Sequence, residues 1–231
     1  MDGILIIDKE KGWTSHDVCA FIRSRFKIKK VGHGGTLDPL ATGLLVILLG
    51  RATRLFDSVA AADKEYGATM RLGIRTDSHD LDGRILEERD PSGITKDDVE
   101  RTFQMFRGEI LQTPPMISAL KHKGMRLYQL ARQGKTVERV QRLVTIHRLE
   151  LKVFRFPEVE FFAHVSKGTY LRTLVDDMGK RLGCFATLTE LRRLKCGEFD
   201  LENAVTLPAL KTMDMKEMSR RVRMSSSALV V

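Results

Sequence analysis

The stretch Gly32-His33-Gly34-Gly35-Thr36-Leu37-Asp38-Pro39-Leu40-Ala41-Thr42-Gly43 carries the strongest structural signal in the chain. Its glycines allow backbone angles that other residues avoid, and they let another group approach the main chain closely. The apolar residues 44–49 follow at once and predict a buried strand. We therefore expect a glycine-rich loop around Asp38 that leads directly into the core.

This loop does not match the commonest phosphate-binding and hydrolase patterns. No Gly-Lys-Ser/Thr follows the glycines at the spacing of a P-loop. Residues 33–35 are similar to part of an esterase oxyanion loop, but the chain contains no Gly-x-Ser-x-Gly. Residues 15–17 read Ser-His-Asp, yet adjacent residues on a helix do not face one another, so they are no triad. Because an Asp before a Pro is usually a turn residue or a helix cap, Asp38 by itself names no reaction.

Apolar periodicity outside the loop predicts both strands and helices. Strands are expected at residues 3–8, 44–49, 65–72, 144–156 and 159–165. Helices are expected after a cap at Thr14 or Ser15, at residues 52–62, at 99–106 after a Thr95–Asp98 capping box, at 125–133, and at 171–182. Since strict βαβ alternation is absent, we expect the α+β class, with a mixed, mostly antiparallel central sheet flanked by helices.

The charge of the chain is basic and unevenly distributed. Its 231 residues include 39 Lys and Arg against 30 Asp and Glu, a formal net charge of +9. Residues 23–30 carry five cations and no acid, and residues 117–148 carry eight cations and one acid. Clustered cations suit a polyphosphate partner, because neutralising phosphates releases condensed counterions. A solvated surface would explain the same clusters, so charge alone leaves nucleic-acid binding open.

Other features narrow the class of protein. No apolar run approaches the ~20 residues that a membrane span requires, and the start lacks the regions of a signal peptide. Cys19, Cys184 and Cys196 are widely separated, so neither a disulfide framework nor a zinc cluster is expected. Residues 80–83, Asp-Leu-Asp-Gly, lack the remaining ligands of a calcium loop and predict a polar turn. We expect a cytoplasmic protein without a membrane segment or a bound metal.

Several motifs accompany the loop in a fixed order. They are Lys64-Glu65-Tyr66, Arg71-Leu72-Gly73 with Thr76-Asp77, Ser118-Ala119-Leu120-Lys121, Ser166-Lys167-Gly168-Thr169-Tyr170-Leu171-Arg172, and Leu191-Arg192-Arg193. With the loop, they make the chain resemble the tRNA pseudouridine synthase B family over roughly residues 3–210. Members of that family modify the uridine at position 55 in the T loop of tRNA.

The resemblance implies a pseudouridine synthase catalytic fold and three catalytic residues. Asp38 is the catalytic aspartate. Tyr66 lies against the target uracil and can take a proton from the sugar. Arg172 pairs with Asp38. Isomerisation of a uridine transfers no electrons and no groups, so no cofactor is expected.

The resemblance also implies residues that bind the substrate. These are His33, which supports the flipped-out RNA, Tyr66, Tyr170 and Leu191, which line the nucleotide pocket, and Lys9 in the first motif. That motif usually reads Lys-Pro-x-Gly in the family, but here residues 9–12 read Lys-Glu-Lys-Gly. Without the proline, which fixes one backbone angle, the turn is less rigid.

The expected organisation is a catalytic domain at residues 1–210 and a short C-terminal tail at 211–231, with a frayed end around Ser225-Ser226-Ser227. The tail has no room for the C-terminal RNA-binding domain that many family members carry. The expected partner is the T arm of tRNA, bound by a monomer.

Each implied role has a plainer alternative. Tyr66 and Leu191 could be core residues, and Arg172 could be a surface cation bonded to Asp176, four residues on. A non-catalytic RNA-binding protein would explain the basic segments but not the combination of Asp38, Tyr66 and Arg172. A hydrolase is weakened by the missing nucleophile motif.

Overall fold

A computed structural model describes residues 1–118 and 120–223 of the chain. Ala119 and the serines at 225–227, where a frayed end is expected, lie outside the described residues. The chain divides into two compact units: Met1–Gly67 with Leu191–Val231, called here the first unit, and Ala68–Glu190, the second unit.

Nine of the strands belong to a mixed, mostly antiparallel sheet, as predicted. The strands of the chain are β1 (Gly3–Lys9), β2 (Val31–His33), β3 (Thr42–Leu49), β4 (Lys64–Leu72), β5 (Ile74–Thr76), β6 (Ile85–Glu88), β7 (Gly108–Gln112), β8 (Lys121–His122), β9 (Met125–Arg126), β10 (Arg142–Arg155), β11 (Glu158–Val165), β12 (Ala186–Cys196) and β13 (Val205–Thr206). The α-helices are α1 (Ser15–Arg25), α2 (Phe56–Ala61), α3 (Lys96–Met105), α4 (Leu127–Arg132), α5 (Leu171–Leu182), α6 (Leu207–Thr212) and α7 (Met215–Arg221), and a 3-10 turn spans Gly50–Leu55.

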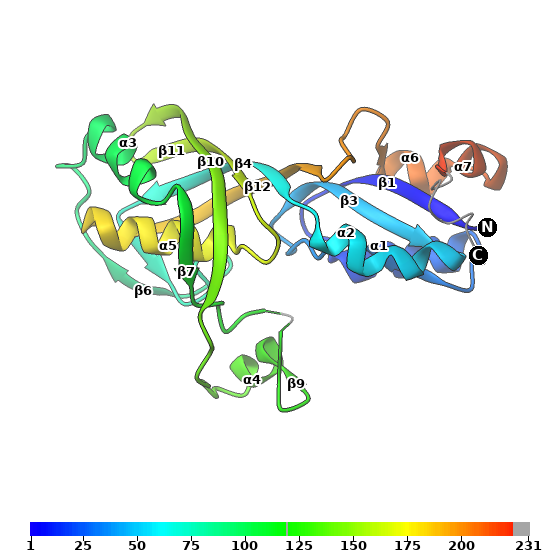
Figure 1. Cartoon of the computed structure of the whole chain (residues 1–231), viewed down its shortest axis with the longest axis horizontal. Coiled ribbons are helices and arrows are strands. Elements are labelled where there is room, and N and C mark those ends of the chain that lie inside the picture. Colours follow the sequence, from blue (N-terminus) through cyan, green and yellow to red (C-terminus); the bar gives the residue numbers. More distant parts are fainter. Residues whose placement is uncertain (119, 224–231) are drawn as a thin grey trace. The chain divides into compact units, whose positions relative to one another are not determined.

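The first unit is built around β1 and β3, which run antiparallel side by side (Figure 1). β13 pairs with β1 and β12 pairs with β3, both in parallel, while β2 lies antiparallel to β3. Alternate residues of β1 and β3, Ile4, Ile6, Leu44, Val46 and Leu48, form one apolar cluster. Burial of such apolar side chains stabilises the fold by about 25 cal/mol per Å² of surface removed from water. This packing holds the loop between β2 and β3 against the core.

Local sequence explains where α1 begins. The side chain of Thr14 accepts a hydrogen bond from the Asp17 backbone N–H, and the Asp17 carboxylate accepts one from the Thr14 N–H. This capping box satisfies donors that a helix start otherwise leaves unpaired. Val18, Cys19 and Ile22 form the buried face of the helix, while Phe21 is half-buried.

In the second unit, β10 and β11 form a long antiparallel pair, and β7 lies on the other side of β10 (Figure 1). Helices α3 and α5 pack together with this part of the sheet, where the Phe103 and Phe161 rings meet edge to face at 5.6 Å. The predicted capping box of Thr95 and Asp98 starts α3. α5 ends at Gly183, whose φ of +80° is a left-handed conformation that glycine adopts without strain.

Several sequence-based expectations were incomplete. Residues 52–62, expected as one helix, form a 3-10 turn at Gly50–Leu55 followed by α2. The predicted helix at 125–133 is shorter: Met125–Arg126 forms β9, and only Leu127–Arg132 is helical. Strand β12 was not predicted, because its polar residues hide the alternation that marks a strand. By contrast, residues 80–83 form a polar turn as predicted, closed by hydrogen bonds from Gly83 N to Asp80 O and from Asp82 N to the Asp80 carboxylate. None of the helices in the described ranges combines the length and the hydropathy needed to span a bilayer.

Strands of the first unit approach closely at Gly43. The strand register places Lys9 of β1 and Arg193 of β12 on either side of Gly43. A Cβ at this position would lie 2.3 Å from the Arg193 carbonyl oxygen and 3.0 Å from its nitrogen, and the φ of Gly43 is +92°. Only glycine fits both the space and the backbone angle.

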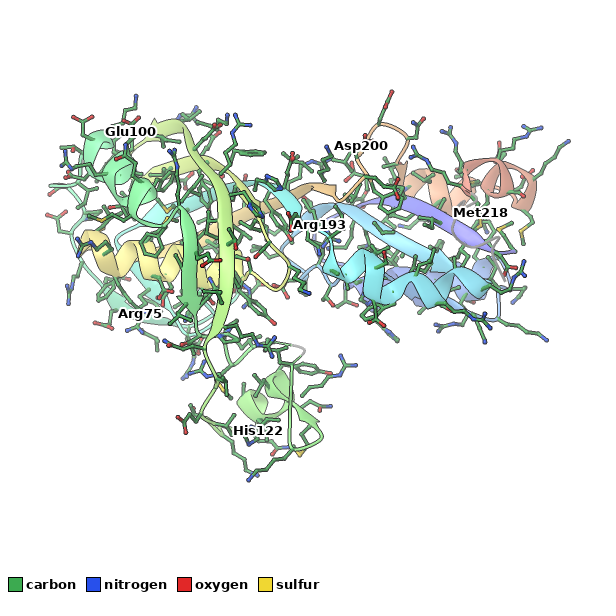
Figure 2. The ribbon with its side chains drawn as sticks, viewed as in Figure 1. Arg75, Glu100, His122, Arg193, Asp200 and Met218 are labelled. Carbon is green, nitrogen blue, oxygen red and sulfur yellow. The ribbon has the colours of Figure 1, made fainter. Side chains whose placement is uncertain are left out.

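A buried carboxylate, Asp176 on α5, organises charges in the second unit. Its oxygens lie 2.5 Å from Lys180 Nζ, 3.3 Å from Arg75 Nε and 3.6 Å from His79 Nε2. Figure 2 labels Arg75 in this unit. Burial lowers the pKa of His79 to about 4, and the Asp176 charge only partly opposes that shift. The folded unit therefore holds His79 as a neutral imidazole.

We expect Gly43→Ala to lower the free energy of unfolding by more than about 2 kcal/mol, since it adds a backbone clash to a strained φ. Gly93→Ala is the matched control, because no atom lies within 4 Å of a Cβ built there. Denaturant unfolding measures both. Equal, small effects of the two substitutions would contradict the close approach of β12 to Gly43.

We also expect acid to weaken the fold through His79. The folded pKa of about 4 lies below the ordinary histidine pKa of 6.5, so the unfolded chain binds this proton first as the pH falls. The contribution of neutral His79 to the free energy of unfolding is therefore fully present above pH 6.5. It is lost as the pH falls towards 4. His79→Asn, which tolerates the positive φ of this residue, should remove on the order of 2 kcal/mol from that pH dependence. Unfolding midpoints at pH 4.5 and 7 test this, with the exposed His16→Asn as control; an unchanged pH slope would contradict it.

Candidate functional site

Asp38 lies in a loop that is anchored on both sides. Ser15 Oγ accepts a hydrogen bond from Leu37 N at 2.8 Å and donates one to Leu37 O at 3.2 Å. On the other side, Gly12 N donates to Pro39 O at 2.8 Å. The side chain of Leu37 is buried, and Asp38 itself is half-exposed. The loop therefore holds a carboxylate at the surface with little freedom of its backbone.

Lys9, predicted to bind substrate, is completely buried at the end of β1. Its Nζ donates hydrogen bonds to Glu10 O at 2.9 Å and to Trp13 O at 2.6 Å, which closes the turn of the first motif. Burial lowers the pKa of Lys9 to about 8, while the negative charge of Asp38 raises it. Lys9 thus supports the turn that contacts the Asp38 loop, and direct contact with RNA stays a prediction.

Tyr66 lies on β4 near Asp38 and is 8% exposed. Burial raises the pKa of its hydroxyl, whereas the charge of Arg193 and a hydrogen bond from that guanidinium lower it. The charge of Asp38 adds to the upward shift. The neutral phenol is therefore the resting form of Tyr66, beside a cation and within range of the Asp38 carboxylate.

Arg193 is the site residue that sequence reasoning missed. It lies on β12, is 2% exposed, and is labelled in Figure 2. Its Nε donates to Leu44 O at 2.7 Å, and its Nη atoms donate to Gly35 O at 3.2 Å and Thr36 O at 3.4 Å. Arg193 is part of the sequence motif at residues 191–193, but nothing in the sequence separates it from its neighbour Arg192, which pairs with Asp8.

Two other predicted residues also belong to the first unit. His33 ends β2, opposite Ile47 of β3. Leu191 lies on β12 and is half-buried, and its carbonyl accepts a hydrogen bond from Thr42 Oγ1 at 3.4 Å. The first unit therefore contains Lys9, His33, Asp38, Tyr66 and Leu191.

Arg172 belongs to the second unit and is no surface cation. It is 3% exposed, and its Nη atoms donate to Ser78 O at 2.8 Å and Ile117 O at 3.0 Å. Its Nε lies 3.4 Å from Asp80 Oδ2. The alternative that placed it in an exposed pair with Asp176 is therefore wrong. Its predicted pairing with Asp38 stays a prediction.

Tyr170, in the second unit, precedes α5 and is held through its backbone. The side-chain amide of Gln112, at the end of β7, accepts from Tyr170 N at 2.8 Å and donates to Tyr170 O at 3.2 Å. Through these two bonds the buried Gln112 side chain holds the backbone of the residue that precedes α5.

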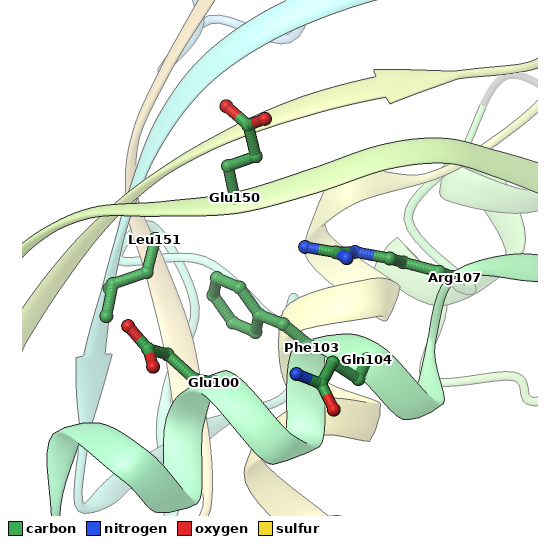
Figure 3. Close-up of a pocket in the computed structure, with 6 residues that line it drawn as sticks. All are labelled: Glu100, Phe103, Gln104, Arg107, Glu150 and Leu151. Carbon is green, nitrogen blue, oxygen red and sulfur yellow. The ribbon is translucent and has the colours of Figure 1, made fainter.

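The second unit contains a pocket of about 340 Å³ whose lining includes none of the predicted residues (Figure 3). It is lined by Glu100, Phe103, Gln104, Arg107, Glu150 and Leu151. The Arg107 guanidinium donates hydrogen bonds to the Leu149 carbonyl, and the Glu150 carboxylate forms ion pairs with Arg148 and Lys152.

Also in this unit, the ring centroids of His147 and His164 lie 4.8 Å apart, and each ring could offer a nitrogen to a metal. The independence of the reaction from metals and cofactors stays a prediction.

Comparison with known proteins gives consistent matches along the chain. The profile of the TruB family pseudouridylate synthase (N terminal domain) matches residues 23–171, and that of the tRNA pseudouridylate synthase B C-terminal domain matches residues 172–227. The tRNA pseudouridine synthase B of Opitutus terrae is 42% identical over 222 residues, covering 96% of this chain and 92% of that protein. The same-named protein of Syntrophotalea carbinolica is 48% identical over 213 residues, covering 92% and 70%.

A solved structure described as a Cbf5-Nop10-Gar1 complex contains a chain with a similar fold. The TM-score is 0.76 at 29% identity, and the match covers 98% of this chain but 61% of the other. The two profiles, the curated relatives and the shared fold lead to one conclusion: the chain belongs to the TruB family of pseudouridylate synthases.

Proposed function

We propose that this pseudouridine synthase converts uridine 55 in the T loop of tRNA to pseudouridine, with Asp38 as the nucleophile. The observation that carries the proposal is the anchored loop. Ser15 and Gly12 hold the backbone on either side of a half-exposed carboxylate. A rigid backbone lets such a carboxylate meet one atom of a substrate in a defined orientation.

The chemistry fits a site made of a carboxylate, a phenol and cations. In the isomerisation the N1–C1′ bond of uridine breaks and a C5–C1′ bond forms, while one proton leaves C5 and one is taken up at N1. Atoms and electrons balance without an oxidant or a second substrate. An ionised Asp38 can attack carbon or stabilise a developing cation. Tyr66, beside it, offers a ring on which the uracil can stack.

The target base has to leave its stack before Asp38 can reach it. Extrusion costs a few kcal/mol, and less for a base in a loop than for a paired base. Contacts of the flipped base with Tyr66, and with the predicted residues His33, Tyr170 and Leu191, would offset that cost. In this proposal Arg172, whose guanidinium already has a fixed orientation, pairs with Asp38.

Binding of the RNA backbone is assigned to exposed cations. Lys27, Lys29 and Lys30 are exposed in the first unit, and Lys123 and Arg126 are exposed in the second. Such side chains suit contacts with phosphates, which position an RNA without reading its sequence. The names of the curated relatives, which are tRNA pseudouridine synthases, support tRNA as the substrate.

Incubation with an unmodified tRNA transcript should produce one new pseudouridine, at position 55. Carbodiimide treatment followed by reverse transcription locates it, because the product has the same mass as uridine. A transcript with cytidine at position 55 is the matched control and should give no stop. Binding without any modification would favour the alternative, a non-catalytic RNA-binding protein, and a stop at another uridine would contradict the assigned position.

Asp38→Asn should abolish turnover, with a fall of at least about 10⁴-fold, while tRNA affinity changes little. The amide keeps the shape of the side chain but cannot act as the nucleophile. Single-turnover rates and filter binding measure the two effects separately. Asp57→Asn, at an exposed position of α2, is the matched control and should leave the rate unchanged. Appreciable activity of Asp38→Asn, after mass spectrometry excludes deamidation, would remove Asp38 from this role.

A further inference from the structure

Arg193 carries a buried positive charge, and its hydrogen bonds go to the main chain. A guanidinium that is 2% exposed is costly unless its donors are satisfied. The hydrogen bonds from Arg193 go to the main-chain carbonyls of Leu44, Gly35 and Thr36. Two of these carbonyls belong to the loop that carries Asp38. A side chain with fewer donors in this place could not bond to all three of these carbonyls.

The charge of the same guanidinium also acts on Tyr66. It lowers the pKa of the Tyr66 hydroxyl, against the upward shift caused by burial. Arg193 therefore holds the loop before Asp38 by hydrogen bonds, and its charge also acts on the tyrosine of β4, a part of the site that is separate in the chain. In the same unit, Ser15 holds the loop at Leu37 but provides no cation.

The backbone explains how the guanidinium enters this position. Arg193 is the register partner of Gly43, where a side chain would collide with the β12 backbone. A Cβ on Gly35 would lie 3.6 Å from Arg193 Nη1, so the loop backbone lies directly against the guanidinium. Since successive strand residues point to opposite faces, Arg192 points away and pairs with Asp8 instead.

We propose that Arg193 is a positioning residue for the isomerisation, which holds the Tyr66 hydroxyl and the Gly35–Thr36 backbone in one fixed arrangement beside Asp38. The inference rests on the proposed function for its kinetic consequence, but not for the contact itself. The planar fork of arginine matters, because a lysine supplies the charge from one point and cannot serve several acceptors in a plane.

The kinetic test compares Arg193→Gln, Arg193→Lys and the matched control Arg192→Gln. Misplacement of catalytic groups by about 1 Å can cost about 100-fold, so we expect Arg193→Gln to lower the single-turnover rate at saturating tRNA by about that factor. The dissociation constant should change by less than about threefold, because no phosphate contact is lost. Arg193→Lys should remain at least about 10-fold slow despite its charge, and Arg192→Gln should react at the wild-type rate.

A double-mutant cycle with Tyr66→Phe distinguishes positioning from general structural support. If Arg193 acts partly through the Tyr66 hydroxyl, its substitution should slow the Tyr66→Phe enzyme by less than about 10-fold. An undiminished effect of about 100-fold in that background would overturn the proposal. So would a wild-type rate for Arg193→Lys, or for Arg193→Gln, with only the melting temperature lowered.

The contact can be tested without any turnover. The chain has three tyrosines, so tyrosine labelled with ¹³C at Cζ gives a simple spectrum, in which Tyr66→Phe identifies the Tyr66 signal. We expect that signal to move in Arg193→Lys, a variant that keeps the buried charge, and to stay in place in Arg192→Gln. An unmoved signal would overturn the contact even if the enzyme were active. Conversely, a shifted signal in a chain that modifies no uridine would retain the contact and refute the proposed function.

Discussion

The close approach of β3 and β12 at Gly43 is the constraint on which the site depends. With no side chain at Gly43, the Arg193 backbone can lie within the space that a Cβ would occupy. That approach sets the register in which Lys9, Gly43 and Arg193 follow one another across three strands. A shift by one residue would turn every side chain of β12 to the opposite face and would remove Arg193 from the Asp38 loop.

Buried cations that hold main-chain carbonyls recur in both units. Lys9 closes the turn of the first motif, Arg193 holds the loop before Asp38, and Arg172 binds the carbonyls of Ser78 and Ile117. Each charge is costly to bury, and each is compensated by main-chain oxygens, most of which belong to loops outside the regular strands. The result is a rigid set of loops, which a reaction on one defined nucleotide requires.

Much of the fold follows from local patterns. The helix cap before α1, at Thr14, and the capping box before α3 were predicted from a few adjacent residues, because a helix end is satisfied by its own neighbours. Strand β12 was not predicted. Its buried Arg193 replaces an apolar residue in the pattern, and only partners on another strand make that burial possible.

By itself, the sequence determined the class of fold, the glycine-rich loop and, through its ordered motifs, the family. It also drew attention to Asp38 and Tyr66, which lie within motifs that are recognisable along the chain and whose catalytic roles stay predictions. The hydrogen-bond partners of Lys9 and Arg193 were decided only by the tertiary structure. Arg193 and Leu44 are 149 residues apart, and no local pattern encodes a hydrogen bond between them. Such a contact exists only once two distant strands have paired in one register, which is set by packing across the sheet.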